Sequence, residues 1–340
     1  MAETKPILEH GGNLDAAAAR YGIARAQWLD LSTGINPCAY PIGEVDAGLW
    51  ARLPEAGAEA ALTDAARAYY GVPAAARVVA APGTQALIQL LPRLRGPSRV
   101  SVIGPTYAEH AHCWRAAGHA VAERGAEAGF DPAADVCVVV QPNNPDGHAI
   151  AAEALLAEAG RRAGSGGWLV VDEAFADVMP EVSLAAAAGA PGLIILRSFG
   201  KFFGLAGARL GFALGDAETA AMITRALGPW AVAGPSLMIG ARALADGDWI
   251  AKARARLAAD AARLDGIVTA AGHRVVGGTD LFRLVEAATP DLHEGLARQA
   301  VWTRAFAGRP GLVRFGLPAD AAGFERLAEA LAAPAARAAS

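Results

Sequence analysis

Short apolar runs alternate with alanine-rich amphipathic segments between residues 60 and 214. The run Val136–Val140 reads Val-Cys-Val-Val-Val, without a polar interruption, which is typical of a strand covered on both faces. Helical segments separate these runs, and this order predicts a mainly parallel α/β sheet. The pattern predicts strands at residues 77–80, 99–103, 119–123, 136–140, 168–171, 193–196 and 210–214, and helices at residues 62–70, 84–94, 108–117 and 151–163.

The pattern changes after Leu214. Two segments rich in alanine, leucine and arginine, residues 217–227 and 236–270, are expected to be helical. Shorter strands are expected at residues 274–276, 281–285 and 312–315, and a closing helix at residues 321–331. These elements predict a smaller α+β domain. We therefore expect three parts: an N-terminal arm (1–40) that joins the small domain, a large α/β domain (41–228) and the small domain (229–340).

The charge balance excludes some classes of partner. The 340 residues include 30 Lys and Arg against 34 Asp and Glu, a net charge of −4. Such a chain has no basic field, so neither nucleic acid nor an anionic membrane is an expected partner. No apolar run is long enough to span a bilayer.

The cysteines and histidines show no metal-binding pattern. Cys38, Cys113 and Cys137 lack ligand-like spacing, and an odd number of cysteines favours reduced thiols and a cytoplasmic location. The seven histidines form no paired motif. His110 and His112 could line one side of a strand or loop, but we interpret them as ordinary structural histidines. No metal is expected.

The segment Ser198–Gly211 carries the clearest chemical signal. It follows the apolar run 193–196 and reads Ser-Phe-Gly-Lys-Phe-Phe-Gly-Leu-Ala-Gly-Ala-Arg-Leu-Gly. A lysine that leaves a buried strand among small residues suits a Schiff base with an aldehyde cofactor. Ser198 and Arg209 supply hydrogen-bond donors for a phosphate. The combination indicates pyridoxal 5'-phosphate (PLP).

Four other predicted strands end in turns that could contribute to the same site, because α/β sheets bind ligands at the carboxyl ends of their strands. Gly83-Thr84 opens a helix whose N–H groups can hold a phosphate, although many such turns contain glycine. Tyr107 could stack on an aromatic ring or belong to the core. Asn144 lies in a segment that also has a favoured turn composition. Asp172 ends an apolar strand, where a buried carboxylate is costly unless it pairs with a cation. A protonated pyridine nitrogen is such a cation.

Taken together, these motifs resemble the fold-type I PLP enzymes of the aminotransferase class, which includes histidinol-phosphate aminotransferase. The resemblance covers nearly the whole chain. It implies that Lys201 is the Schiff-base lysine, that Asp172 pairs with the pyridine nitrogen and that Tyr107 stacks on the ring. It further implies a ring-hydroxyl contact from Asn144. The residues that would hold the cofactor phosphate are Gly83, Thr84, Ser198 and Arg209.

Other features resemble a narrower group, the L-threonine-O-3-phosphate decarboxylases of cobalamin biosynthesis. Many aminotransferases carry a tyrosine three residues after the pyridine-pairing aspartate, and this chain has Phe175 there, without the hydroxyl donor. The segments Glu9–Asn13, Ser32–Pro37 and Trp302–Phe306 also resemble these decarboxylases.

The resemblance extends to the substrate. It implies that Arg314 grips the α-carboxylate, for which a bidentate guanidinium is well shaped. A histidine, two glycine amides and an asparagine can form an anion nest for a phosphate, with further charge from an arginine. The residues concerned are His10, Gly11, Gly12, Asn36 and Arg304. Without the resemblance, the same N-terminal glycines are typical of a flexible arm with a turn.

The implied activity is decarboxylation of L-threonine O-3-phosphate to (R)-1-amino-2-propanol O-2-phosphate and CO2, with the N-terminal arm contributing to the active site. The alternative is a histidinol-phosphate or related aminotransferase, which would align the Cα–H bond rather than the Cα–carboxylate bond for cleavage. A PLP-sensing regulator or a degenerate member is disfavoured, because no DNA-binding module is visible and both Lys201 and Asp172 are present. The resemblance also implies a homodimer.

Overall fold

The computed structural model describes residues 11–332. Its helices are α1 (Leu14–Tyr21), α2 (Gly48–Ala51), α3 (Ala56–Tyr70), α4 (Thr84–Leu90), α5 (Glu109–Ala116), α6 (Ala152–Ala163), α7 (Phe199–Phe202), α8 (Ala217–Leu227), α9 (Gly234–Ala245), α10 (Gly247–Ala270), α11 (Leu292–Ala297) and α12 (Ala321–Ala332). Its strands are β1 (Leu29–Asp30), β2 (Arg77–Ala81), β3 (Arg99–Gly104), β4 (Ala120–Gly125), β5 (Val136–Val140), β6 (Trp168–Asp172), β7 (Leu193–Ser198), β8 (Gly211–Gly215), β9 (Arg274–Thr279), β10 (Phe282–Glu286), β11 (Val301–Trp302), β12 (Arg304–Ala305) and β13 (Leu312–Gly316).

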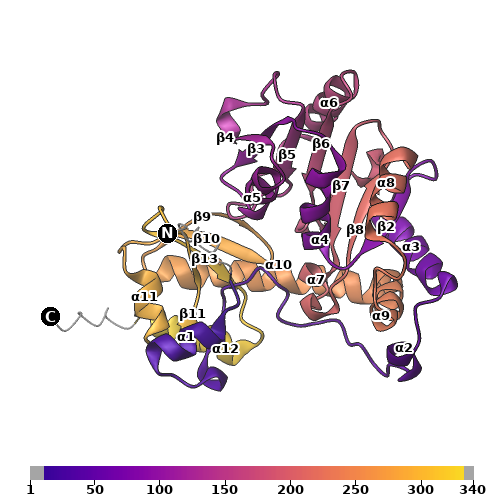
Figure 1. Cartoon of the computed structure of the whole chain (residues 1–340). Helices are drawn as coiled ribbons and strands as arrows, with labels where there is room; N and C mark the ends of the chain where they lie inside the picture. The colour runs from indigo at the N-terminus through magenta and orange to yellow at the C-terminus, as the bar shows by residue number, and fades with distance from the viewer. Residues whose placement is uncertain (1–10, 333–340) are drawn as a thin grey trace, which may run out of the picture. The chain divides into compact units, whose positions relative to one another are not determined.

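A seven-stranded sheet dominates the fold, in the order β2-β8-β7-β6-β5-β3-β4. The strands from β7 to β4 are mutually parallel, and β8 runs antiparallel to both β2 and β7. Figure 1 shows these strands side by side, with α8 and α3 along the β8–β2 edge. The expected α/β fold with a mainly parallel sheet is confirmed.

Both faces of this sheet are covered. All five residues of β5 and of β6 are buried, which explains their uninterrupted apolar sequence. On one face, Val138, Val170 and Leu196 belong to a core that also includes residues of α4, α5 and α8. The residues that alternate with them, such as Leu169 and Ile195, point to the opposite face and are fully buried as well.

The remaining strands form two small sheets. An antiparallel sheet has the order β12-β13-β10-β9, and β1 pairs in parallel with β11. The latter pairing joins the N-terminal region to the C-terminal part of the chain, because Leu29 lies opposite Val301. No helix among the described residues is both long and apolar enough to cross a membrane.

Two compact units divide the chain. The large unit comprises residues 38–253, and the small unit comprises the residues up to 37 and from 254 onward. This division differs from the expected boundary at residue 228, because α9 packs on α3: a Cβ on Gly240 would approach the side chains of Leu62 and Leu210 to 2.8 and 2.5 Å. Helix α9 therefore belongs with the large sheet.

The structure corrects one expected helix. Residues 236–270 do not form one helix, because the chain breaks between α9 and α10 at Asp246. The carboxylate Oδ1 of Asp246 accepts a hydrogen bond from Trp249 N at 3.0 Å, which caps the start of α10. The short elements α1, α11, β1, β11 and β12 have no counterpart in the expected pattern.

Candidate active site

The expected site residues divide into two sets, one in each unit, which we call the strand-end cluster and the arginine cluster. The strand-end cluster belongs to the large unit and comprises Gly83, Thr84, Tyr107, Asn144, Asp172, Ser198, Lys201 and Arg209. The arginine cluster belongs to the small unit and comprises Gly11, Gly12, Asn36, Arg304 and Arg314. His10 lies outside the described residues.

Asp172 ends β6 and is buried against a histidine. Its Oδ2 lies 2.8 Å from Nε2 of His110 on α5, and its Oδ1 accepts a hydrogen bond from Ala174 N at 3.1 Å. Both side chains are almost fully buried. A carboxylate only accepts hydrogen bonds, so Nε2 of His110 donates to it. This contact fixes the direction in which the Asp172 carboxylate points.

Tyr107 follows β3 and is held by a short chain of hydrogen bonds. Its hydroxyl donates to Oε1 of Gln85 at 3.1 Å, and Nε2 of Gln85 donates to Glu109 at 3.0 Å. Burial, with added repulsion from Glu109 and Asp172, raises the pKa of Tyr107 to about 12. The hydroxyl therefore remains protonated at neutral pH, and the ring is fixed next to His110, with 6.1 Å between the ring centroids.

A glycine-lined turn brings Gly83, Thr84 and Arg209 together. Gly83 has φ +84°, and a Cβ there would lie 2.7 Å from Nη2 of Arg209. A Cβ on Gly211 would lie 2.6 Å from the backbone N of Thr84. Both positions therefore require glycine, and the close approach places an exposed guanidinium beside the start of α4.

Lys201 lies on the short helix α7, directly after β7. Its Nζ is 5.6 Å from the ring centroid of Phe175, which lies in the turn after β6. Ser198, the last residue of β7, pairs with Gly211 of β8. Ser198 therefore ends the strand next to β6, which carries Asp172, and Lys201 follows it on α7.

Asn144 lies in a loop after β5 that is held by side chains on either side of it. Gln141 donates through Nε2 to Ile150 O at 2.7 Å and accepts through Oε1 from Ile150 N at 2.9 Å. Asn143 accepts from the hydroxyl of Thr106 at 2.6 Å and donates to Asp146 at 2.8 Å. These contacts tie the loop that carries Asn144 to the loop that carries Tyr107.

Two arginines of the arginine cluster lie opposite each other on neighbouring strands. Arg304 of β12 and Arg314 of β13 are direct partners in the antiparallel register. Arg314 is buried, donates through Nη2 to Ser32 O at 3.0 Å and lies over the ring of Phe282. Burial, together with repulsion from Arg304, lowers the pKa of Arg314 to about 10. Like charges placed opposite each other are unfavourable, and a bound anion relieves the repulsion.

The other members of the arginine cluster lie on the N-terminal segment. A Cβ on Gly11 would lie 2.3 Å from Ser32 O, so that position requires glycine. Gly12 N donates to the hydroxyl of Ser32 at 2.7 Å. Because Ser32 O also accepts from Arg314, Gly11, Gly12 and Arg314 all meet at Ser32.

Asn36 is buried and bound by an arginine. Its Oδ1 accepts a hydrogen bond from Nη2 of Arg256 on α10 at 2.7 Å. The same guanidinium forms an ion pair with Asp260 at 3.1 Å. Arginine can only donate, so the contact fixes which way the Asn36 amide is turned.

The sequence interpretation missed several of these residues. His110, for which the sequence predicts no specific contact, is the partner of Asp172. Its spacing of three residues after Tyr107, at the start of an expected helix, was the available signal, because such residues share a helix face. For Gln85, Asn143 and Arg256, the sequence contains no pattern that predicts their contacts. No group of three or more potential metal ligands occurs in the described part of the chain.

Comparisons with known proteins show the family of the chain. The model of the aminotransferase class I and II family matches residues 44–331. Threonine-phosphate decarboxylase from Pseudomonas aeruginosa is 49% identical over 329 residues, covering 96% of this chain and 97% of the relative. A threonine-phosphate decarboxylase from Sinorhizobium sp. is 47% identical over 331 residues, with coverages of 96% and 98%.

A solved structure extends the likeness to the fold. Histidinol-phosphate aminotransferase from Sinorhizobium meliloti, in complex with pyridoxal 5'-phosphate, superposes with a TM-score of 0.81 at 20% identity. The match covers 97% of this chain and 95% of that one. From the family match and the relatives of nearly full length, the chain belongs to the class I and II aminotransferase family.

Proposed function

We propose that this protein is a PLP-dependent carboxy-lyase that converts L-threonine O-3-phosphate to (R)-1-amino-2-propanol O-2-phosphate and CO2. Two relatives that match nearly its whole length carry the name threonine-phosphate decarboxylase. The observation that carries the choice of a doubly acidic substrate is the opposition of Arg304 and Arg314 across β12 and β13. A carboxylate and a phosphate on one small molecule match two neighbouring guanidiniums.

The strand-end cluster has the chemistry that PLP requires. Lys201 supplies an amine for the aldehyde, Asp172 a carboxylate for the ring nitrogen, and Ser198 and Arg209 donors for the phosphate. Gly83 keeps the space next to Arg209 clear of a Cβ. The donor set and the glycine-lined turn therefore fit this cofactor.

Bound PLP supplies an electron sink that stabilises the negative charge left on Cα when one of its bonds breaks. Asp172 would hold a proton on the ring nitrogen, and the contact with His110 fixes the direction of the carboxylate. Lys201 Nζ would be the point of attachment of the cofactor, and when released it would be the group that delivers a proton to Cα. Tyr107 supplies the ring that stacks on the cofactor, and Asn144 the amide for its hydroxyl.

The arginine cluster holds the acidic groups of the substrate. In this proposal Arg314 binds the α-carboxylate, and Arg304, Asn36 and the amide of Gly11 bind the phosphate. Gly12, whose N–H donates to the hydroxyl of Ser32, shapes the turn beside the phosphate. His10 is proposed to join them from outside the described residues. Holding both ends of the substrate fixes the rotation about the Cα bonds, and this rotation decides whether the carboxylate or the hydrogen leaves.

Two further properties belong to the proposal. We expect a homodimer, as the resemblance implies. We also expect a reducing, cytoplasmic location, because Cys38, Cys113 and Cys137 form no disulfide bond among the described residues. Burial raises the pKa of Cys113 to about 11 and that of Cys137 to about 12, which suits structural rather than reactive thiols.

The test is incubation of the PLP-loaded protein with L-threonine O-3-phosphate in the absence of any 2-oxo acid. The proposal expects catalytic release of CO2 together with 1-amino-2-propanol phosphate. L-threonine without the phosphate is the matched control and should react far more slowly. Amino transfer from histidinol phosphate to 2-oxoglutarate, without CO2 release from threonine phosphate, would contradict the proposal.

A further inference from the structure

A cluster of buried charges lies directly behind the strand-end cluster. We call it the buried ion cluster, and it consists of Glu173, Asp177, Ser183 and Arg197, with the ring of Tyr70 below the guanidinium.

Arg197 is the centre of the buried ion cluster. It is 3% exposed, and its Nη1 lies 2.6 Å from Glu173 while its Nη2 lies 3.0 Å from Asp177. Ser183 donates to Glu173 at 2.6 Å, and the guanidinium carbon is 4.3 Å from the centroid of the Tyr70 ring. Burial alone would lower the pKa of Arg197, but attraction to Asp177 and Glu173 outweighs it and raises the pKa above its ordinary value.

The cluster is adjacent in sequence to two proposed cofactor contacts. Glu173 follows Asp172 at the end of β6, and Arg197 precedes Ser198 at the end of β7. In the parallel register Asp172 pairs with Leu196, so Asp172 and Ser198 share one face of the sheet. Glu173 and Arg197 therefore point to the opposite face, and their ion pair joins the two strand ends from behind.

Backbone contacts of the same residues reach a third loop. Glu173 N donates to Leu196 O at 2.8 Å, which fixes the end of β6 against β7. The hydroxyl of Thr84 donates to Arg197 O at 3.2 Å. Arg197 is thus connected to the loops that carry Asp172, Ser198 and Thr84.

Stability alone does not account for such a cluster. Charges taken out of water lose hydration, and well-packed apolar residues of the same volume often stabilise a fold as well or better. Unlike apolar packing, the planar guanidinium of an arginine can fix the direction of two carboxylates at once.

We propose that Arg197 is a positioning residue for the cofactor, which sets the spacing of the strand ends that carry Asp172, Ser198 and Thr84. The inference rests on the proposed function, because it concerns the binding of PLP. It does not depend on which bond of the substrate is broken.

The test is Arg197→Lys, which keeps the positive charge and removes the planar guanidinium. The dissociation constant of PLP is measured by titrating the apoprotein, and the visible circular dichroism of the bound cofactor reports its fixed orientation. We expect PLP binding to weaken by about tenfold, the size of effect seen when residues that orient a metal ligand are replaced. The circular dichroism should fall as well.

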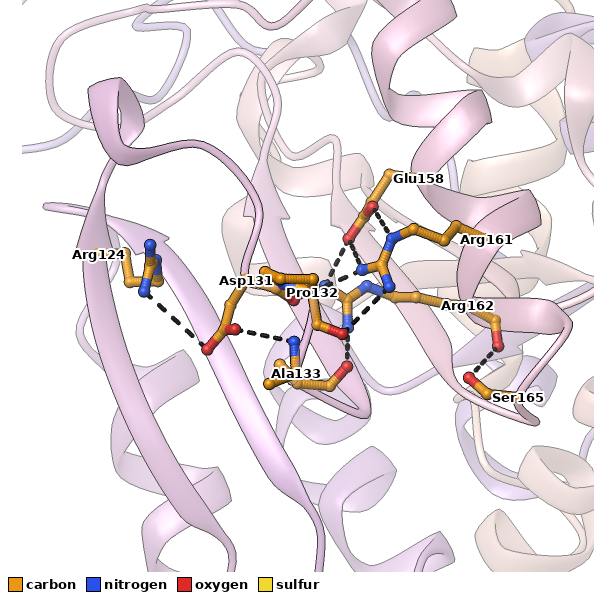
Figure 2. A network of polar contacts seen from close by, with 9 residues as sticks. Arg124, Asp131, Pro132, Ala133, Glu158, Arg161, Arg162 and Ser165 are labelled. Carbon is orange, nitrogen blue, oxygen red and sulfur yellow. Dashed lines mark hydrogen bonds and ion pairs between the residues drawn. The ribbon is translucent and has the colours of Figure 1, made fainter.

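The matched control is a second buried arginine at the other end of the sheet. Figure 2 shows Glu158 between Arg161 and Arg162, with Arg162 directed at the loop before β5. Arg162 is 1% exposed, lies 2.5 Å from Glu158 and also donates to Asp131 O at 3.1 Å. Arg162→Lys should lower the thermal midpoint of the apoprotein comparably and leave PLP affinity within about twofold of the wild type, because distant sites act independently.

If Arg197→Lys does not fold, Glu173→Gln replaces it, since that change removes the carboxylate charge from the Glu173–Arg197 pair that joins the two strand ends. PLP affinity lost in the Arg197 or Glu173 variant and kept in Arg162→Lys supports the inference. Unchanged PLP affinity in the first variant, or equal losses in both arginine variants, overturns it. A wild-type protein that takes up no PLP would instead refute the proposed function, and the inference with it.

Discussion

At the scale of single residues, each proposed catalytic group has a neighbour that fixes its direction. His110 orients Asp172, Gln85 orients Tyr107, and Phe175 lies beside Lys201. The sequence proposes Asp172, Tyr107 and Lys201 as site residues because each ends or follows an apolar run. Their neighbours were not predictable, since His110 and Gln85 contact them only after α4 and α5 fold onto the same face of the sheet.

Replacement of Lys201 by alanine tests the attachment of the cofactor. The change removes the only amine that we assign to the aldehyde, so PLP should bind without the visible absorbance typical of a lysine-linked cofactor. Absorbance spectra of the dialysed proteins measure this. Lys252→Ala, an exposed lysine of α10, is the control and should keep the wild-type spectrum. An unchanged spectrum for Lys201→Ala would refute its role.

Replacement of Arg314 by glutamine tests the carboxylate site. Loss of a charged hydrogen-bond donor should weaken substrate binding by about 2 kcal/mol, or roughly 30-fold, while PLP binding changes little. Spectroscopic titration measures both constants. Arg274→Gln removes an exposed arginine from strand β9 of the same sheet and should leave both constants unchanged. Equal losses of substrate and PLP binding would contradict the role of Arg314.

The same site predicts a dependence on pH. Because burial and Arg304 lower the pKa of Arg314 to about 10, its guanidinium is charged below that pH and neutral above it. Binding of an amine-free phosphorylated carboxylic acid should therefore weaken as the pH rises through about 10. Arg304→Gln removes the repulsion and should move this loss to higher pH. A midpoint that stays the same would show that Arg304 does not act on Arg314.

At the scale of elements, the site depends on the turns that follow β2, β3, β5, β6 and β7. The apolar periodicity predicted these strands within a few residues, because buried parallel strands need uninterrupted apolar sequence. The break between α9 and α10 was missed, because alanine and leucine continue on both sides of Asp246 and a capping carboxylate looks like any exposed acid. The pairing of β1 with β11 was not predictable either, since two-residue strands carry no periodicity.

Gly83→Ala tests the turn after β2. A side chain at φ +84° is strained, and the new Cβ would crowd the guanidinium of Arg209. Gly71→Ala is the matched control, because Gly71 also has a positive φ, of +68°, but has no atom within 4 Å of its Cβ position. Both variants should lose about 1 kcal/mol of stability or more. Only Gly83→Ala should weaken PLP binding. Equal PLP affinity in the two variants would contradict a role of the glycine-lined turn in binding the cofactor phosphate.

At the scale of the whole molecule, the large unit carries the strand-end cluster and the small unit carries the arginine cluster. The sequence proposes the members of both clusters, because strand-end motifs and the resemblance of the N- and C-terminal segments are local signals, and their roles stay predictions. The boundary between the units was harder to predict, since α9 joins the large unit only through its packing on α3. Both clusters would also serve a transaminase, so the central claim concerns which bond to Cα breaks.

The most direct measurement of that claim uses L-threonine O-3-phosphate with deuterium on Cα. Decarboxylation leaves the Cα–deuterium bond intact, so the account predicts 1-amino-2-propanol phosphate that retains the label, as read by mass spectrometry. Transamination removes the same atom as a proton, and the label would be lost to water. Retained deuterium with one CO2 per product supports a decarboxylase, and loss of the label without CO2 would contradict it.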